Sequence, residues 1–480
     1  MGKYNVTIGL EMHCEVSETK SKVFSSSKNE YTDIPNANIS PYDMGFPGVL
    51  PVLNKEAVRM SLMMSMILNC RQPEYMYFER KNYYYPDMPK NYQITQNPPE
   101  DCVGMEGYID IIREDGSTFR VGIDNIHLEE DAASMNHLYD TSVIDYNRAG
   151  VPLLELVTKP DLHSADDAVA FLEYIRAIYQ YCGISEADSK KGQIRCDVNV
   201  SISDGETLGT KVEVKNVNSF SGVRETINYE IKRQSELKDA GRYDEVVQET
   251  RRWDEESGTT IRMRSKVDAE DYKYFVEPNI PRYKISKEWL EEIRASIPEL
   301  PYERKEKYMQ EYGLSDYDAG ILVKDINIAK YFEKTISLGV DAKTAANWIT
   351  GNILGYTYKY EIQIQELYLT PERLTVILDS MRDGKISSKQ AKELFYMVLE
   401  RLEEPADIMK KEGMQQISDD GAIIAIVSEV LNENLSQIEE YKAGKTNMFD
   451  YFVGQVMKKT RGQANPVKVK EILTEELAKR

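Results

Sequence analysis

Four short segments of this chain carry charged or hydrogen-bonding side chains at every second position. Apolar residues stand between them, a period of two that is typical of β-strands with one buried and one polar face. The polar side chains are Glu11, His13 and Glu15; His127 and Glu129; Arg195, Asp197 and Asn199; and Lys211, Glu213 and Lys215. If the four strands belong to one sheet, a single face gathers carboxylates, imidazoles, an amide and lysines.

These residue types favour one kind of chemistry. Carboxylate oxygens with one or two imidazoles suit a hard divalent ion, Mg²⁺ or Mn²⁺, and lysines suit phosphate oxygens. The pair Asp197-x-Asn199 adds an oxygen-ligand spacing. The combination predicts a metal–nucleotide site in which the ion and the lysines offset the charge that develops in phosphoryl transfer. The alternative is a sheet face that is simply exposed to water, which antiparallel sheets commonly have.

The elements that must position these side chains can be inferred from caps and periodicity. Residues 164–183 read as a helix that begins at Ser164 and ends at Gly183, and a second helix follows Ser219. Strands and helices alternate irregularly, without a βαβ rhythm, which favours an α+β fold with an antiparallel sheet. After Pro298 the pattern becomes almost wholly helical, and Thr370-Pro371 reads as a cap followed by the first residue of a helix.

Length and composition fit this organisation. A chain of 480 residues predicts about three domains, and we place them at residues 1–295, 296–405 and 406–480. The 41% hydrophobic content is ordinary for a globular protein, and no apolar run approaches the roughly 18 residues of a membrane span. The first residues lack the features of a signal or transit peptide, so we expect a cytoplasmic protein without membrane contact. Five widely spaced cysteines without a C-x-x-C motif argue against a disulfide framework and a cysteine zinc site.

Common nucleotide and metalloprotease motifs are absent from the sequence. There is no Walker A sequence, no G-x-G-x-x-G and no H-E-x-x-H, which disfavours a P-loop kinase, a Rossmann oxidoreductase and a zincin. Ser-Ser-Lys within KISSKQ could suggest an amidase nucleophile. Because it follows Gly384 and opens a helical pattern, we interpret Ser387 or Ser388 as an N-cap.

Two further segments each have two interpretations. The aromatic-rich stretch KNYYYPDMPKNYQITQ (residues 81–96) is either a packed loop or a lid over a polar site, with Lys81 or Lys90 reaching inward. The net charge of −20 disfavours non-specific nucleic-acid binding, yet residues 441–480 hold nine basic against four acidic residues. In that tail Lys458, Lys459, Arg461, Lys468 and Lys470 surround a turn. They belong either to a solvated helical hairpin or to a surface that contacts RNA phosphates.

The segments IGLEMHCEV, FPGVLPVLN, RKNYYYPDMPKNYQITQ, IHLEEDAA, DYNRAGVPLLELVTKPDLHS, KKGQIRCDVNVSI, GTKVEVKNVNSF, ETRRWDEESGTTIRMRSK, DYKYFVEPNIP and YFVGQVMKKTRGQANP are long and occur in a characteristic order. Together they resemble the B subunit of the glutamyl/aspartyl-tRNA amidotransferase, the GatB family, over nearly the whole chain. Two departures are minor: Ala133 stands where that family more often has Gly, and Lys159 where an acidic residue is common.

The resemblance implies a fold and an activity. Residues 1–295 would form a cradle, an ATP-dependent kinase and transamidase domain that resembles the glutamine synthetase catalytic fold. A helical domain (296–405) and a YqeY-like tail (406–480) would grip tRNA. With ATP and Mg²⁺ the protein would phosphorylate the side-chain carboxylate of misacylated Glu-tRNA(Gln) or Asp-tRNA(Asn). Ammonia from an amidase-type A subunit, which works with a small C subunit, would then displace phosphate.

The resemblance also assigns site residues by motif match. The implied metal ligands are Glu11, His13, Glu130, Asp197 and Glu213. The implied nucleotide-binding residues are Asp197, Asn199, Glu213 and Asn216, and the implied catalytic residues are Lys81, Glu129, Glu130 and Lys215. There are three alternatives. An archaeal E-type subunit would carry an extra inserted domain, which the short linker between the cradle and the helical region does not hold. The other two are a non-catalytic tRNA-binding scaffold and a stand-alone carboxylate–amine ligase. Whether Glu-tRNA(Gln), Asp-tRNA(Asn) or both are substrates, and what Glu15 does, are left undecided.

Overall fold

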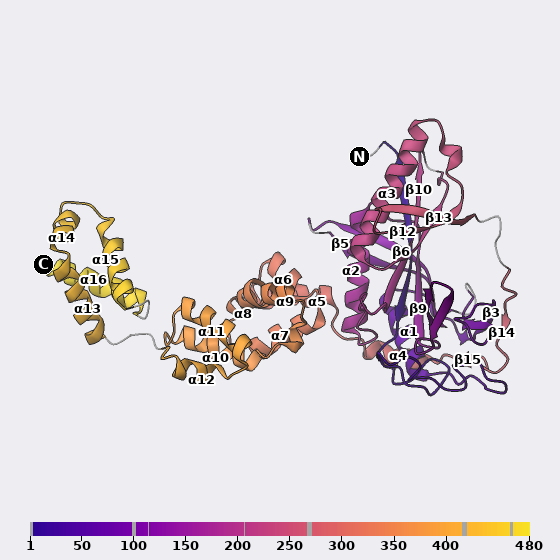
Figure 1. Cartoon of the computed structure of the whole chain (residues 1–480), viewed down its shortest axis with the longest axis horizontal. Helices are drawn as coiled ribbons and strands as arrows, with labels where there is room; N and C mark the ends of the chain where they lie inside the picture. The colour runs from indigo at the N-terminus through magenta and orange to yellow at the C-terminus, as the bar shows by residue number, and fades with distance from the viewer. Residues whose placement is uncertain are drawn as a thin grey trace. The chain divides into compact units, whose positions relative to one another are not determined.

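The computed structural model of the protein describes residues 3–97, 102–113, 115–205, 207–265, 271–414, 420–460 and 464–480. The chain divides into two compact units, Met1–Pro301 and Tyr302–Arg480. Figure 1 shows a large sheet with helices in the first unit and helices in the second. The α+β class expected for the first unit and the helical character expected for the rest are confirmed.

The first unit is built on an eight-stranded sheet with the order β13-β12-β11-β10-β1-β9-β6-β5. Its strands are β1 (Asn5–Glu15), β5 (Gly104–Ile112), β6 (Thr118–Glu130), β9 (Pro152–Thr158), β10 (Ile194–Ser203), β11 (Val212–Val217), β12 (Glu249–Asp254) and β13 (Thr259–Ser265). Neighbouring strands are antiparallel, except β11 and β12, which run parallel. The four segments predicted as strands are β1, β6, β10 and β11, so all four belong to one sheet.

Helices cover the apolar face of this sheet. They are α1 (Lys55–Ile67), α2 (Ala165–Tyr181) and α3 (Phe220–Asp239), and each packs against strands of the sheet (Figure 1). Their N-caps are Asn54, Ser164 and Ser219, whose side chains accept hydrogen bonds from backbone N–H groups of the first turn. The helices predicted after Ser164 and Ser219 are thereby confirmed. Ile8, Leu10 and Met12 of β1 join the core that these helices bury.

Short strands and helices complete the first unit. They are β2 (Tyr75–Met76), β3 (Glu79–Asn82), β4 (Tyr92–Thr95), β7 (Ser134–Leu138), β8 (Thr141–Asp145), β14 (Phe275–Val276), β15 (Tyr283–Lys284), the 3₁₀ turn η1 (Tyr243–Glu245) and α4 (Lys287–Ala295). The small sheet β14-β3-β4 contains residues 81–82 and 92–95 of the aromatic-rich segment, and β4 packs beside β6. This segment therefore has regular structure next to the polar strand rows.

Every regular element that the structure describes in the second unit is helical. They are α5 (Pro301–Tyr312), α6 (Asp316–Leu322), α7 (Ile326–Ser337), α8 (Ala342–Trp348), the π-helical turn η3 (Ile349–Ile353), α9 (Leu354–Tyr360), η4 (Ile364–Glu366), α10 (Pro371–Arg382), α11 (Ser388–Arg401), α12 (Pro405–Lys411), α13 (Asp420–Glu433), α14 (Leu435–Lys442), α15 (Met448–Lys459) and α16 (Pro466–Ala478). Thr370 caps α10 as predicted. Ser387 is the N-cap of α11 and forms a capping box with Gln390, so the cap interpretation of KISSKQ is confirmed.

This unit contains two separate hydrophobic clusters. One gathers buried residues from Tyr308 to Met414, and the other gathers buried residues from Ile423 to Leu477. The domain boundaries predicted near residues 295 and 405 stay predictions. The corresponding changes in the structure fall at Pro301 and between Met414 and Ile423.

Two findings concern the whole of the described chain. Among these residues, no helix combines the length and the apolar character that crossing a membrane requires. The five cysteines are free thiols, and four of them are buried.

Candidate functional site

The strand register places the predicted polar rows side by side on the face opposite the helices. On β1, Glu11 lies opposite Asp197 of β10, and His13 lies between Arg195 of β10 and Glu155 of β9. The other rows join the same face: His127 of β6 is opposite Glu155, and Asn199 of β10 is opposite Glu213 of β11. Side chains two positions apart on a strand point to the same face. Glu129 therefore shares this face with His127, and Lys215 shares it with Glu213. The shared face predicted from the sequence is confirmed.

Two overlapping groups on this face can hold a metal ion. The first is Glu11, His13 and Glu155, and the second is His127, Glu129 and Glu155; within each group the ligand atoms lie within 4.8 Å of one another. Each group offers two carboxylates and one imidazole, a donor set that a divalent ion such as Mg²⁺ or Mn²⁺ accepts. Nδ1 of His13 is buried and has no hydrogen-bond partner among the described residues. The donor set and this unpartnered nitrogen fit a divalent ion.

Protonation balances the charges of these groups when no ion is bound. Burial would lower the pKa of His13, but the carboxylates of Glu11, Glu155 and Glu129 outweigh it and raise the pKa to about 9. Burial raises the pKa of Glu129, and the charge of Glu155 adds to this. For Glu155, burial is outweighed by the imidazoles of His127 and His13 and by Lys81, so its pKa is held below the usual value. The protonated imidazole therefore supplies part of the positive charge that a bound ion would bring. Binding of an ion must then release the protons of the side chains that become its ligands.

A second cluster lies on β10 and β11 beside the first. The ammonium of Lys215 donates to Asp197 Oδ2 at 2.9 Å and lies 3.4 Å from Glu213 Oε1. Burial would lower the pKa of Lys215, but Asp197 and Glu213 outweigh it and raise the pKa. Oδ1 of Asn199 is buried without a hydrogen-bond partner among the residues that the structure describes. The cluster thus combines a fixed cation with unused acceptor capacity, while the side chain of Asn216 lies outside the described residues.

Lys81 lies on β3, at the small sheet that packs next to β6. Its ammonium lies 4.9 Å from the centre of the Tyr272 ring, and Tyr272 also makes an edge-to-face contact with Tyr83. The charge of Lys81 acts on the pKa of both Glu129 and Glu155. Lys81 is therefore the cation that the aromatic segment brings toward the metal-capable groups.

Glu130 lies apart from both metal-capable groups. Its Oε2 accepts a hydrogen bond from Lys90 Nζ at 2.8 Å, and its Oε1 accepts one from the backbone N–H of Ile94 at 2.8 Å. Consecutive residues of a strand point to opposite faces. Glu129 reaches the polar face, where its Oε2 also accepts a hydrogen bond from the hydroxyl of Thr95 at 3.1 Å, while Glu130 turns to the other face, toward Lys90 and the backbone of Ile94. The predicted metal and catalytic roles of Glu130 stay predictions that this geometry does not support. Of the two lysines expected to reach inward, Lys90 is the one that binds Glu130.

Sequence reasoning missed Glu155 and Thr250. Glu155 is the one charged residue of PLLELVT, and a lone carboxylate in an apolar strand is the signal that could have identified it. Thr250 donates its hydroxyl to Glu213 Oε2 at 2.9 Å. No local pattern marks Thr250, because the contact depends on the pairing of β12 with β11.

Glu15 lies at the end of its polar row, away from the metal-capable groups. Burial and the charge of Asp131 raise the pKa of Glu15 to about 8, against the opposing effect of Arg195 and Arg148. Asp131 itself receives a hydrogen bond from Arg195 at 2.9 Å and lies 3.3 Å from Arg148. These charges belong to a separate network at the edge of the site.

The tail presents some of its predicted basic surface. Lys458 and Lys470 are exposed, whereas Lys459 is paired with Glu429 and Glu433 at 2.9 and 2.8 Å. Lys468 lies 2.7 Å from Asp420, and Arg461 is outside the described residues. Internal pairing thus reduces the positive charge that is available to a ligand.

Comparison with known proteins gives full-length matches. A family model described as the GatB/GatE catalytic domain matches residues 6–291, and one described as the GatB domain matches residues 330–477. A relative from Geobacillus kaustophilus (strain HTA426) is 44% identical over 480 residues, which are 99% of this chain and 100% of the relative. One from Bacillus mycoides (strain KBAB4) is 44% identical over 98% of this chain and 99% of its own length. Both relatives are named as the B subunit of aspartyl/glutamyl-tRNA(Asn/Gln) amidotransferase.

Proposed function

Because this chain belongs to the GatB family, we propose that it acts as the B subunit of an aspartyl/glutamyl-tRNA(Asn/Gln) amidotransferase. In the proposed reaction a carboxylate oxygen of the tRNA-borne Glu or Asp attacks the γ-phosphorus of ATP, and ADP leaves. The nitrogen of ammonia then attacks the acyl carbon, phosphate leaves, and one proton of the new C–N group is released. Phosphorylation is needed because a free carboxylate would have to expel oxide.

The observation that carries this proposal is the shared carboxylate of Glu155. It joins Glu11 and His13 to His127 and Glu129 on one sheet face. Mg²⁺, or Mn²⁺, would be held by these side chains, and when bound it would neutralise charge on the phosphate oxygens. Asp197 and Glu213, expected from the sequence as ligands, lie next to this group across β1 and β10 and would complete the site around the nucleotide.

In this proposal, lysine side chains of the chain neutralise the remaining negative charge of the phosphate groups. Lys215, held between Asp197 and Glu213, would bind phosphate oxygens, and Lys81 would lie at the acyl phosphate and the point where ammonia arrives. Asn199, whose buried Oδ1 has no hydrogen-bond partner among the described residues, and Asn216 would contact the nucleotide. Burial of these groups strengthens their interaction with developing charge.

The proposed partners follow from the same family. An amidase-type A subunit would release ammonia from glutamine, a small C subunit would complete the complex, and the second unit would hold tRNA in the cytoplasm. The cradle would resemble the glutamine synthetase catalytic fold, and the tail a YqeY-like domain. An E-type subunit is disfavoured, because relatives named as B subunits match this chain over their whole length and leave no room for an inserted domain.

Two alternatives are separated by experiment. We expect Glu11→Ala and Asp197→Ala, each in the complex reconstituted with its A and C subunits, to lower tRNA-dependent ADP formation by about 100-fold or more. The matched control is Asp110→Ala, which removes an exposed carboxylate at the edge strand β5 of the same sheet. Wild-type amidation by both site variants would favour a tRNA-binding scaffold and contradict the catalytic proposal. Activity on free glutamate without tRNA or partners would instead favour a stand-alone ligase.

A further inference from the structure

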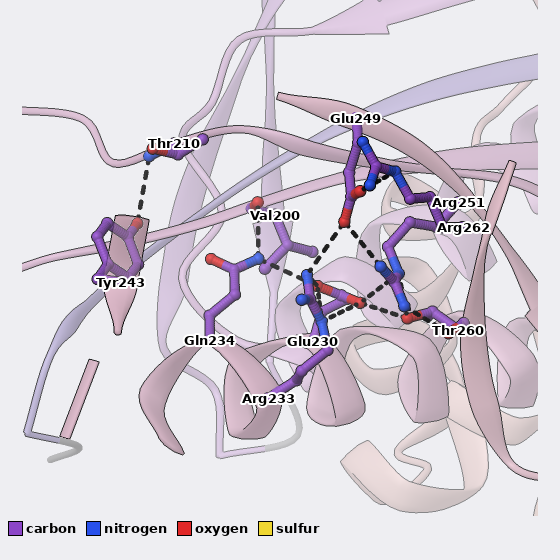
Figure 2. A network of polar contacts seen from close by, with 10 residues as sticks. All are labelled: Val200, Thr210, Glu230, Arg233, Gln234, Tyr243, Glu249, Arg251, Thr260 and Arg262. Carbon is purple, nitrogen blue, oxygen red and sulfur yellow. Dashed lines mark hydrogen bonds and ion pairs between the residues drawn. The ribbon is translucent and has the colours of Figure 1, made fainter. Parts of the chain in front are cut away.

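A buried ion network lies between α3 and the strands β12 and β13 at one edge of the sheet. Figure 2 shows the carboxylates of Glu230 and Glu249 among the guanidinium groups of Arg233, Arg251 and Arg262. Glu230 has no exposed surface, and Glu249 is 4% exposed. Each of the two buried carboxylates is therefore paired with guanidinium groups, an arrangement that fixes the elements carrying them.

The network ties β12 to its neighbours on one face. Arg251 of β12 donates to Glu249 Oε1 at 2.7 Å and to the carbonyl and hydroxyl oxygens of Thr260 on β13, both at 2.7 Å. The Thr260 hydroxyl in turn donates to Glu230 Oε1 of α3 at 2.5 Å. Arg233 of α3 donates to both oxygens of Glu230 (Figure 2). Strand β12 is thus held at Glu249 and at Arg251.

Thr250 lies between these two anchored residues and points to the opposite face. It is 4% exposed, and in the parallel ladder it lies opposite Glu213. Its hydroxyl donates to Glu213 Oε2 at 2.9 Å, while Glu213 Oε1 faces Lys215 Nζ at 3.4 Å. The two oxygens of Glu213 therefore have different partners, and the hydroxyl fixes which oxygen faces the lysine.

We infer that Thr250 is a positioning residue for the nucleotide-binding cluster of Asp197, Glu213 and Lys215. The hydroxyl prevents Glu213 from rotating, which keeps Lys215 between its two carboxylates and oriented toward the substrate phosphate. The ion network on the other face of β12 holds the backbone of Thr250 in place. Thr250 then acts on the orientation of Glu213 through one hydrogen bond, that of its hydroxyl. The inference rests on the proposed function, because it assigns the cluster to Mg²⁺·ATP.

The test is the variant Thr250→Val in the reconstituted complex. Valine keeps the shape and the β-branch but removes the hydroxyl, and hydrogen bonds to a charged group contribute about 1.5 kcal/mol or more. We expect the KM for Mg²⁺·ATP to rise about 10-fold, while the KM for the aminoacyl-tRNA stays within about twofold. Thr250→Ser, which restores the hydroxyl, should return the KM for Mg²⁺·ATP to within about twofold of wild type. A purely structural role would not separate the two KM values in this way.

Control variants keep the inference falsifiable. Thr259→Val removes a hydroxyl at the start of β13 whose one hydrogen bond among the described residues joins it to Ser257, and the variant should leave both KM values unchanged. If Thr250→Val does not fold, Thr250→Ala takes its place as the variant without the hydroxyl. Its KM values for Mg²⁺·ATP and for the aminoacyl-tRNA are then compared with those of Thr250→Ser. A wild-type KM for Mg²⁺·ATP in the hydroxyl-free variant overturns the inference. If Glu11→Ala and Asp197→Ala are fully active, the proposed function itself fails, a result that does not depend on Thr250.

Discussion

The imidazoles of His13 and His127 converge on one atom, Oε2 of Glu155. His13 Nδ1 lies 3.7 Å from this oxygen and His127 Nε2 lies 3.4 Å from it. The two histidines come from β1 and β6, which are separated in the sheet by β9, the strand that carries Glu155. A single carboxylate on a central strand therefore joins two potential metal-binding groups into one.

Replacing Glu155 should disrupt both groups at once. We expect Glu155→Gln to weaken Mn²⁺ binding by about 100-fold, because the variant removes the negative charge and one donor that both groups share. The measurement is Mn²⁺ titration followed by calorimetry, together with tRNA-dependent ADP formation. The matched control is Glu15→Gln, a partly buried glutamate on the same face of the sheet that belongs to neither group. Equal Mn²⁺ affinity in the Glu155 and Glu15 variants would exclude Glu155 as a ligand.

Glu130 should respond differently, because its carboxylate is bound to Lys90 and Ile94. Breaking a buried ion pair from one side costs about 3–5 kcal/mol, since the remaining charge loses its partner. We therefore expect Glu130→Gln to lower the free energy of unfolding by about 3 kcal/mol in urea denaturation, while the folded variant binds Mn²⁺ within about twofold of wild type. The double variant Lys90→Met with Glu130→Gln should recover part of the lost stability. Loss of Mn²⁺ binding at unchanged stability would restore the metal-binding role predicted from the sequence.

Lys22 should make the stability of the first unit depend on pH in the alkaline range. Its buried ammonium donates to the carbonyl of Tyr146 at 3.2 Å and lies 3.7 Å from Asp43 Oδ1. Burial outweighs the nearby carboxylates and lowers the pKa of Lys22 to about 8 from 10.5. Between these two pH values the unfolded chain binds more protons than the folded one, so the free energy of unfolding contributed by Lys22 rises with pH. Below pH 8 both states are protonated and this contribution no longer changes.

Urea denaturation at pH 8, 9 and 10 tests this expectation. The variant Lys22→Met should lose the rise that the wild type shows over that range. Lys28→Met is the matched control, because Lys28 is exposed and is paired, within the part of the chain that the structure describes, only with the exposed Glu30. Parallel pH profiles of the wild type and the Lys22 variant would show that Lys22 keeps an ordinary pKa.

The period of two in β1, β6, β10 and β11 predicts a polar row on each strand, because strand alternation is a local property of the sequence. That the four rows share one face depended on the condition that the strands belong to one sheet, which the structure meets. Glu155 escaped this pattern. Its strand β9 is central and carries Leu153 and Val157 on the same face as Glu155, so no polar alternation is visible. Glu130 shows the reverse case, since motif matching places two adjacent glutamates in one site although neighbouring strand residues must diverge.

Thr250 could not be predicted for a different reason. Its hydroxyl reaches Glu213 only because β12 pairs in parallel with β11, after a connection that contains α3. This contact joins residues 37 positions apart and leaves no trace in the local sequence pattern. The positive charge that the tail presents could not be predicted for the same reason. The composition counts every lysine, whereas the fold pairs some of them with acidic residues.

The exposed lysines of the tail should supply salt-dependent affinity for tRNA. Lys458 and Lys470 are free to contact phosphates in this interpretation, whereas Lys459 is paired with Glu429 and Glu433. Each phosphate contact releases counterions, so we expect Lys458→Ala with Lys470→Ala to weaken tRNA binding and to reduce the slope of log Kd against log salt concentration by about 1 to 2. Filter binding of the complex at several salt concentrations measures both quantities. Lys459→Ala is the matched control and should change the slope less, because its charge is already compensated. An unchanged slope in the double variant would assign the tail to a solvated helical hairpin without RNA contact.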